Sequence, residues 1–166
     1  MSSQKSEPFD TPERSEIPGI THGHVAAMEA SVDGEPEVVW VMYNMPHLML
    51  RTVGRKSGSV RKVALPYWID ENGHPIVVGS YAGAPKHPAW YLNLADRDAN
   101  PELYVKTRHD QYWTEADVLE GEERARIWEA LTRDRDYYLD YQKLTERELP
   151  LIRLAKKRPA DGPPKD

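Results

Sequence analysis

The dipeptide Asn72-Gly73 is the feature of this sequence that most restricts its fold. Both residues tolerate a positive φ angle, and a two-residue turn of this kind joins antiparallel strands without splaying them. β-rich segments lie on both sides of the turn, at Val60–Asp70 and Ile76–Tyr81, and His47–Val53 precedes them with the same character. We therefore expect a meander of three antiparallel strands between residues 47 and 81.

The rest of the chain adds strands and short helices to this meander. Further strands are expected at Glu37–Tyr43, Glu102–Thr107, Tyr112–Leu119 and Leu149–Ala155. Helices are expected at His24–Ser31, Pro88–Arg97, Glu122–Arg133 and Asp136–Leu144. Sequential hairpins in a chain of this length favour a small antiparallel barrel. The expected fold class is therefore mainly β, within α+β, with about six or seven antiparallel strands and short helices packed outside the barrel.

Local composition divides the chain into three parts. Residues 1–21 are polar, contain prolines and have no periodicity, which is typical of a mobile N-terminal arm. Residues 22–156 are expected to form one domain, and residues 157–166 are expected to be a disordered tail.

Composition also narrows the classes of function. The chain has no cysteine, which excludes disulfides and thiol chemistry and fits a cytoplasmic location. The net charge of -5 argues against nucleic-acid binding. No apolar run reaches the roughly 18 residues that span a bilayer, so membrane contact is expected to be peripheral at most. The histidines lack metal-ligand spacing outside His22 and His24, and no metal is expected.

A basic cluster surrounds the segment GRKSG at residues 54–58. Its five cations, in a chain that is acidic overall, are Arg51, Arg55, Lys56, Arg61 and Lys62. Glycines at both ends of a turn allow backbone N–H groups to approach an anion, and clustered cations repel one another unless an anion is bound. The segment is either a phosphate or carboxylate site or a solvated turn with basic flanks. Of Arg61 and Lys62, at least one is expected to be merely solvated, because neighbours on a strand face opposite sides.

Two aromatic segments leave similar alternatives. Trp90, in GAPKHPAWYLNL, is either a core residue or the wall of a pocket for an aromatic ligand. Tyr138 and Tyr141, in RDYYLDYQKL, form either a core face or a wall from which a phenol donates a proton.

Four segments together resemble a known family. They are LMLRTVGRKSGSVRKVALPYWID, VVGSYAGAPKHPAWYLNL, LEGEERARIWEAL and YYLDYQKLTERELPLIRL. In this order and spacing the chain resembles the actinobacterial deazaflavin (coenzyme F420)-dependent nitroreductase and quinone reductase family. The resemblance implies a split β-barrel and hydride transfer from reduced F420 to a quinone, an activated alkene or a nitroaromatic compound. An FMN-dependent split-barrel oxidoreductase and a ligand carrier without turnover are the alternatives.

The resemblance also implies site residues. Those that would bind the cofactor are Gly54, Arg55, Lys56, Ser57, Gly58, Pro66, Ser80, Tyr81, Ala82, Gly83, Ala84, Lys86, Trp90 and Asn93. Tyr138 and Tyr141 would border the substrate and act in catalysis. Arg135 stands where some relatives have a further tyrosine, and a cation is therefore expected near the mouth of the substrate pocket. The partner is expected to be a small-molecule acceptor, and the protein a monomer or a weak homodimer.

Overall fold

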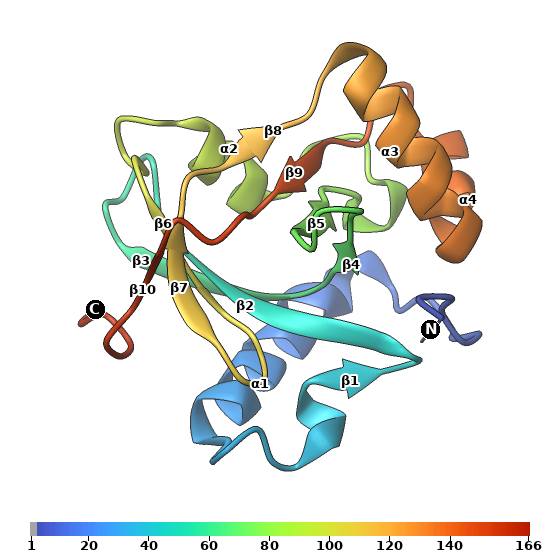
Figure 1. The fold of residues 1–166 in the computed structure, drawn as a ribbon. Helices are drawn as coiled ribbons and strands as arrows, with labels where there is room; N and C mark the ends of the chain where they lie inside the picture. Colours follow the sequence, from blue (N-terminus) through green and yellow to red (C-terminus); the bar gives the residue numbers. More distant parts are fainter. Residues whose placement is uncertain (1–2) are drawn as a thin grey trace.

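The computed structural model describes residues 3–166, which form two antiparallel sheets with helices around them (Figure 1). The larger sheet contains β1 (Val41–Met42), β2 (Met45–Val53), β3 (Val60–Pro66), β6 (Leu103–Lys106), β7 (Gln111–Thr114) and β10 (Arg158–Pro159). The smaller sheet contains β4 (Trp68–Ile69), β5 (Pro75–Val78), β8 (Asp117–Val118) and β9 (Leu151–Arg153). The α-helices are α1 (Ile17–Ala30), α2 (Ala89–Ala95), α3 (Gly121–Asp134) and α4 (Tyr137–Lys143).

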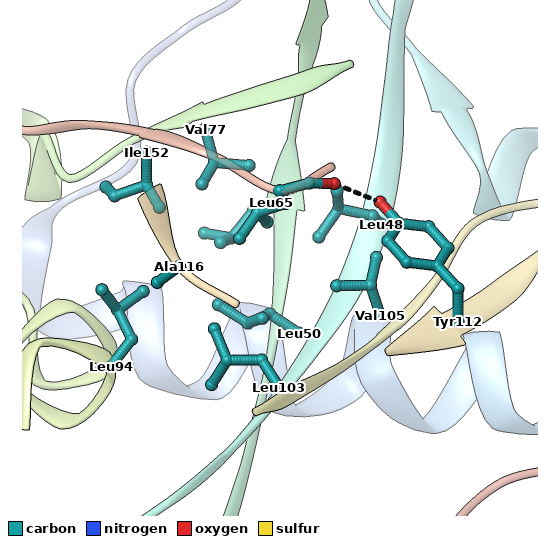
Figure 2. Close-up of a cluster of buried hydrophobic side chains, with 11 residues drawn as sticks. Leu48, Leu50, Leu65, Val77, Leu94, Leu103, Val105, Tyr112, Ala116 and Ile152 are labelled. Atoms are coloured by element: carbon teal, nitrogen blue, oxygen red, sulfur yellow. Dashed lines mark hydrogen bonds between the residues drawn. The ribbon is translucent and has the colours of Figure 1, made fainter. Parts of the chain in front are cut away.

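The two sheets share a central hydrophobic core. Leu48 and Leu50 of β2 point into it from the larger sheet, and Val77 and Ile152 point into it from the smaller one (Figure 2). Tyr112 of β7 lies in the same core, and its hydroxyl donates a 2.7 Å hydrogen bond to the Leu154 carbonyl. The phenol is buried there without an unpaired polar atom, which would otherwise destabilise the core.

Each sheet is also covered on its outer face. On the larger sheet, Met49 of β2 and Tyr104 of β6 pack against Met28 of α1. On the smaller sheet, Ile76 of β5 packs with Ile127 of α3. Successive strand residues point to opposite faces, so apolar neighbours along β2 and β5 supply two different cores.

The structure confirms the hairpin elements and corrects their grouping. The expected strand over residues 112–119 is split into β7 and β8, and that over residues 60–70 into β3 and β4; in each case the two parts belong to different sheets. The break between β3 and β4 follows Pro66, which has no N–H to donate, and the next N–H, that of Tyr67, bonds to the Pro46 carbonyl. Mixed α+β with antiparallel sheets is confirmed, but the strand pairings do not close a barrel within residues 3–166.

The number of strands was also underestimated. The described residues form ten strands, of which six have three or more residues and four have only two. Two-residue strands carry too little pattern to be recognised in a sequence. The expected first strand, Glu37–Tyr43, is one such case: a 3-10 turn at Glu37–Val39 follows Pro36 and leaves only β1 in extended form.

Elements also lie beyond the expected domain boundaries. Helix α1 begins at Ile17, inside the segment expected to be a mobile arm, and β10 lies in the expected tail, where it pairs with β7. Pro18 is compatible with the first turn of α1. The sequence did not indicate this turn, because residues 17–21 show no helical periodicity. The mobility of the arm and the disorder of the tail stay predictions.

The β4–β5 turn is organised by Asp70. One carboxylate oxygen accepts hydrogen bonds from the N–H groups of Asn72 and His74, each 2.9 Å long, and the other accepts a 2.9 Å bond from Arg153 Nε. Burial acts to raise the pKa of Asp70, but the hydrogen bonds outweigh it and hold the pKa below its ordinary value. The carboxylate thus connects the Asn72-Gly73 turn to β9.

We expect Asp70→Asn to lower the free energy of unfolding at pH 7 by about 1–3 kcal/mol, because the bonds involved are charge-assisted. Since the pKa of Asp70 is lower in the folded state, its contribution is full above the ordinary carboxyl pKa and is lost as the pH falls through the lowered value. The difference between variant and wild type should therefore shrink in acid. Urea unfolding at pH 7 and pH 3 measures this difference in the free energy of unfolding, and the exposed Glu129→Gln serves as control. Equal stabilities of Asp70→Asn and wild type at pH 7 would contradict the stabilising role of Asp70.

Candidate functional site

A cavity of about 800 Å³ opens beside β2 and β3. Its walls come from both strands, the end of β5, the loop after β5, α2 and α4. The N-terminal segment and α1 complete it, with residues 9–12, 17–18 and 20–22. Segments far apart in the sequence therefore meet around one space, of a size typical for a small-molecule or cofactor site.

The structure brings half of the expected site residues to this cavity. Those that line it are Pro66, Ser80, Tyr81, Ala82, Trp90, Asn93, Tyr138 and Tyr141. Those outside the lining are Gly54, Arg55, Lys56, Ser57, Gly58, Gly83, Ala84 and Lys86. The second set consists of the GRKSG loop and of the later residues of the loop after β5.

The GRKSG loop is a compact turn between β2 and β3. The Gly54 N–H donates a 2.7 Å bond to the Ser59 carbonyl, and the Gly58 N–H donates a 2.8 Å bond to the Gly54 carbonyl. A Cβ at position 54 would lie 2.6 Å from Ser57 Oγ and 3.3 Å from the Ser59 carbonyl oxygen, so the Ser57 side chain would have to move. The tight turn places Arg55 and Lys56 at its tip, where Lys56 is exposed.

Asn93 of α2 links this loop to the cavity. Its side-chain oxygen accepts bonds from the Arg55 backbone N–H (3.2 Å) and from Arg55 Nη1 (3.0 Å). Asn100 fixes α2 in turn, because its side chain bonds to both backbone groups of Val53 and to the Asn93 carbonyl. Asn93 is buried and lines the cavity, so Arg55 is held at one end of that space.

The five cations of the basic cluster are not equivalent. Lys62 bonds to Glu29 and Asp166, and Arg51 lies 3.7 Å from Asp166. Arg55, Lys56 and Arg61 form no ion pair with any carboxylate in residues 3–166. Arg61 and Lys62 both line the cavity, although neighbours on a strand were expected to face opposite sides. Positive charge without a partner therefore remains at this end of the cavity.

The loop after β5 has an unusual backbone. Tyr81 and Ala82 have φ angles of 44° and 51°, in the left-handed region that residues with a Cβ rarely adopt, and Gly83 follows at 78°. A Cβ at Gly83 would lie 2.6 Å from the Tyr141 carbonyl oxygen, so the loop packs directly on α4. Backbone strain of this kind persists where the surroundings hold it in place, and it is concentrated at functional sites.

Arg147 supplies that support. Its guanidinium donates bonds to the carbonyls of Gly79 (3.0 Å), Ser80 (2.8 Å) and Ala84 (2.8 Å). It also contacts His87 Nδ1 at 3.2 Å. One side chain thus fixes both ends of the strained loop from a position more than sixty residues away in the sequence.

Aromatic side chains form the wall opposite the strands. Tyr137, Tyr138 and Tyr141 of α4 contact one another, and Phe9 of the N-terminal segment lies edge-on to Tyr137 with ring centroids 4.9 Å apart. Burial raises the pKa of Tyr138 and of Tyr141. Both phenols therefore stay protonated at neutral pH.

Arg135 does not lie at the mouth of this cavity, and that expectation was wrong. The side chain is 1% exposed and does not line the cavity. It donates a 2.8 Å bond to the Gln4 carbonyl and a 3.2 Å bond to the Tyr67 carbonyl. The guanidinium is turned into the protein, where it attaches the N-terminal segment to the chain after β3.

Sequence reasoning missed several residues of the site. His47 and Tyr137 line the cavity, and Arg147 holds its loop. A histidine within the apolar strand MPHLML was a visible signal for the first. Arg147 gave none, because its acceptors are backbone carbonyls distant in sequence.

Fold and site together define a class of protein: one with a cavity suited to a planar aromatic molecule that carries an anionic arm. The aromatic wall and apolar lining suit the planar part, and the cations without partners suit the arm. The model of the F420H(2)-dependent quinone reductase family matches residues 21–156. The chain belongs to this family, whose cofactor is coenzyme F420 and whose reaction is F420H2-dependent reduction of a quinone.

Individual relatives agree with this assignment. Over 113 residues the chain is 37% identical to a Mycobacterium tuberculosis protein, Rv3178, provisionally named an F420H(2)-dependent quinone reductase; the match covers 66% of this chain and 89% of that protein. F420H(2)-dependent quinone reductase Rv1261c of the same species is 29% identical, with 68% and 74% covered. A solved F420-H2 dependent reductase, FDR-A, superposes with a TM-score of 0.56 at 36% identity, covering 66% of this chain and 94% of that one.

Two further observations concern the described residues as a whole. No helix within residues 3–166 is both long and apolar enough to cross a membrane. In the same range, no three acidic or histidine side chains come together as metal ligands would.

We expect Ala82→Gly to raise the free energy of unfolding by about 0.5–1 kcal/mol. Glycine removes the steric cost of the left-handed conformation, about 1–2 kcal/mol, while part of the gain is lost to the greater freedom of glycine in the unfolded chain. Thermal unfolding of the cofactor-free protein measures the change. The matched control is Ala26→Gly on the exposed face of α1, which should destabilise by about 1 kcal/mol; destabilisation at both positions would show that the loop is not strained at Ala82.

Proposed function

We propose that the cavity holds the ring system of F420H2 next to its electron acceptor, with the anionic arm of the cofactor directed to the GRKSG loop. The observation that supports this most strongly is the contrast among the clustered cations. Arg51 and Lys62 are neutralised by carboxylates of the chain itself, whereas Arg55, Lys56 and Arg61 have no such partner within residues 3–166. An anionic ligand would relieve their mutual repulsion.

The residues present fit such a cofactor. Arg55 offers a planar fork for phosphate or carboxylate and Lys56 a mobile point charge. Ser57 and the glycines on either side, Gly54 and Gly58, shape the turn that presents them. Ser80, Tyr81, Ala82 and Trp90 would hold the ring system, together with Pro66 and Asn93. Gly83 and Ala84 would fix the path of this loop through their contacts with α4 and Arg147, and the exposed Lys86 would offer a further cation to the cofactor.

Reduced F420 supplies a hydride when it is bound. The chain orients the reacting partners and limits the access of water. Arg147 and Asn93 keep the strained loop and the GRKSG loop in fixed positions, so the site is organised before ligands arrive. Tyr138 and Tyr141 form the surface on which the acceptor lies, and their neutral hydroxyls donate hydrogen bonds to its oxygen atoms.

We further propose that the two sheets are the halves of a split barrel. A quinone is the acceptor class of the family, and we extend it to activated alkenes and nitroaromatic compounds, because these are also flat, electron-poor hydride acceptors that can lie against the tyrosine rings. We propose a cytoplasmic protein that is a monomer or a weak homodimer; one solved relative, 33% identical, is described as a domain-swapped dimer.

We expect Arg55→Ala to weaken F420 binding by about ten- to a hundredfold, since it removes a charge-assisted contact of about 1.5–3 kcal/mol. Lys56→Ala should act in the same direction. Titration of the protein with F420, followed by tryptophan fluorescence, gives the Kd.

The control is Arg133→Ala, which removes an exposed cation of α3 outside the cavity lining and should leave the Kd unchanged. Unchanged affinity in both loop variants would remove the GRKSG loop from the site. A parallel titration with FMN tests the alternative cofactor: tighter binding of FMN than of F420 would overturn the proposal.

We expect Tyr138→Phe and Tyr141→Phe each to lower kcat/KM for menadione by about two- to tenfold. Each variant removes one hydrogen bond between neutral groups, and this is the loss of transition-state stabilisation expected from such a bond. A dedicated proton donor would lose about a hundredfold or more. Steady-state kinetics at pH 7 separates the two cases. Tyr91→Phe, which alters a tyrosine outside the lining, is the control.

A further inference from the structure

His47 has no assigned role, yet it occupies an unusual position. It lies on β2 opposite Pro66 of β3, is 7% exposed, and lines the cavity. Its neighbours Leu48 and Leu50 belong to the central core. A polar ring within the apolar segment MPHLML therefore lies on the opposite face of β2 from Leu48 and Leu50, and it lines the cavity.

The hydrogen bonds of the ring determine its tautomer. Nδ1 lies 2.9 Å from the Met45 carbonyl oxygen. A carbonyl only accepts, so Nδ1 must carry the proton of this bond. In the neutral ring Nε2 then has a lone pair and no proton, which makes it an acceptor.

Nε2 makes no hydrogen bond within residues 3–166, whereas Nδ1 is engaged by the Met45 carbonyl. An unpaired nitrogen on a ring that lines the cavity is a hydrogen-bond acceptor for a molecule bound there.

The surroundings keep the ring neutral. Burial lowers the pKa of His47 to about 4; the bond to Met45 acts in the opposite direction, and His24 and Arg135 lower the pKa further. The His24 ring lies 5.2 Å away between centroids. Arg135, buried without a carboxylate partner in the described chain, thus has an electrostatic consequence for the cavity although it does not line it.

We propose that His47 is a specificity-determining residue, whose Nε2 accepts a hydrogen bond from a hydroxyl or N–H group carried by the electron acceptor. The inference rests on the proposed function, in that the acceptor occupies this cavity. Nε2 repels the oxygen of a quinone carbonyl, which is itself only an acceptor. The residue therefore favours acceptors whose ring bears a donor substituent, and it turns their carbonyl groups away from β2.

A matched pair of substrates tests this. Menadione and its 2-hydroxymethyl analogue differ by one hydroxyl. In His47→Val the KM for the hydroxymethyl compound should rise about five- to fiftyfold, while that for menadione changes by less than about twofold. His47→Gln, which restores an acceptor oxygen, should recover part of the difference. The control is His109→Ala, an exposed histidine of the β6–β7 turn. Equal changes for both substrates in His47→Val, or none for either, would overturn the proposal.

A second measurement does not depend on turnover or on the variants. In the wild-type, cofactor-free protein, the ¹⁵N resonance of His47 Nε2 should report an unprotonated nitrogen, and it should shift with the hydroxymethyl compound much more than with menadione. A protonated Nε2, or identical shifts with both compounds, would overturn the assignment. Failure of the F420H2-loaded protein to reduce menadione would instead count against the proposed function, so the two failures are distinguishable.

Discussion

The burial of both faces of two antiparallel sheets is the constraint on which the rest of the structure depends. The sheets meet in one core, α1 covers the outer face of the larger sheet, and α3 and α4 cover that of the smaller one. Strands buried on both faces have apolar residues at successive positions rather than in alternation. A polar residue on such a strand must have a hydrogen-bond partner or face a cavity. Thr52 and His47 are two such residues of β2, and both line the cavity.

The sequence alone predicted much of this arrangement, and the parts that it predicted are local. The Asn72-Gly73 turn, the β6–β7 hairpin and the buried stripe of α3 depend on residues close together in the chain. The family resemblance likewise came from contiguous segments. The division of the strands between two sheets was not visible, because it depends on one missing N–H at Pro66 and on pairing with segments more than seventy residues away.

The same distinction applies to the site. The residues that face the cavity from conspicuous motifs, such as Trp90 and Ala82, were predicted, whereas the residues that hold those motifs in place were not. Arg147 and Asn100 act through backbone carbonyls of other segments, and such contacts leave no spacing or composition to recognise. Arg135 shows the opposite case. Its position in the sequence suggested a residue of the pocket, but its side chain is buried in the protein interior.

The N-terminal wall of the cavity has a consequence for how the protein is made. Thr11 bonds to the hydroxyl of Tyr141, and the Gln4 carbonyl accepts from Arg135, across about 130 residues in each case. Synthesis proceeds from the N-terminus to the C-terminus, so residues 4–11 are made well before the residues of this chain that they contact. A growing chain therefore has no complete cavity until α4 has been made.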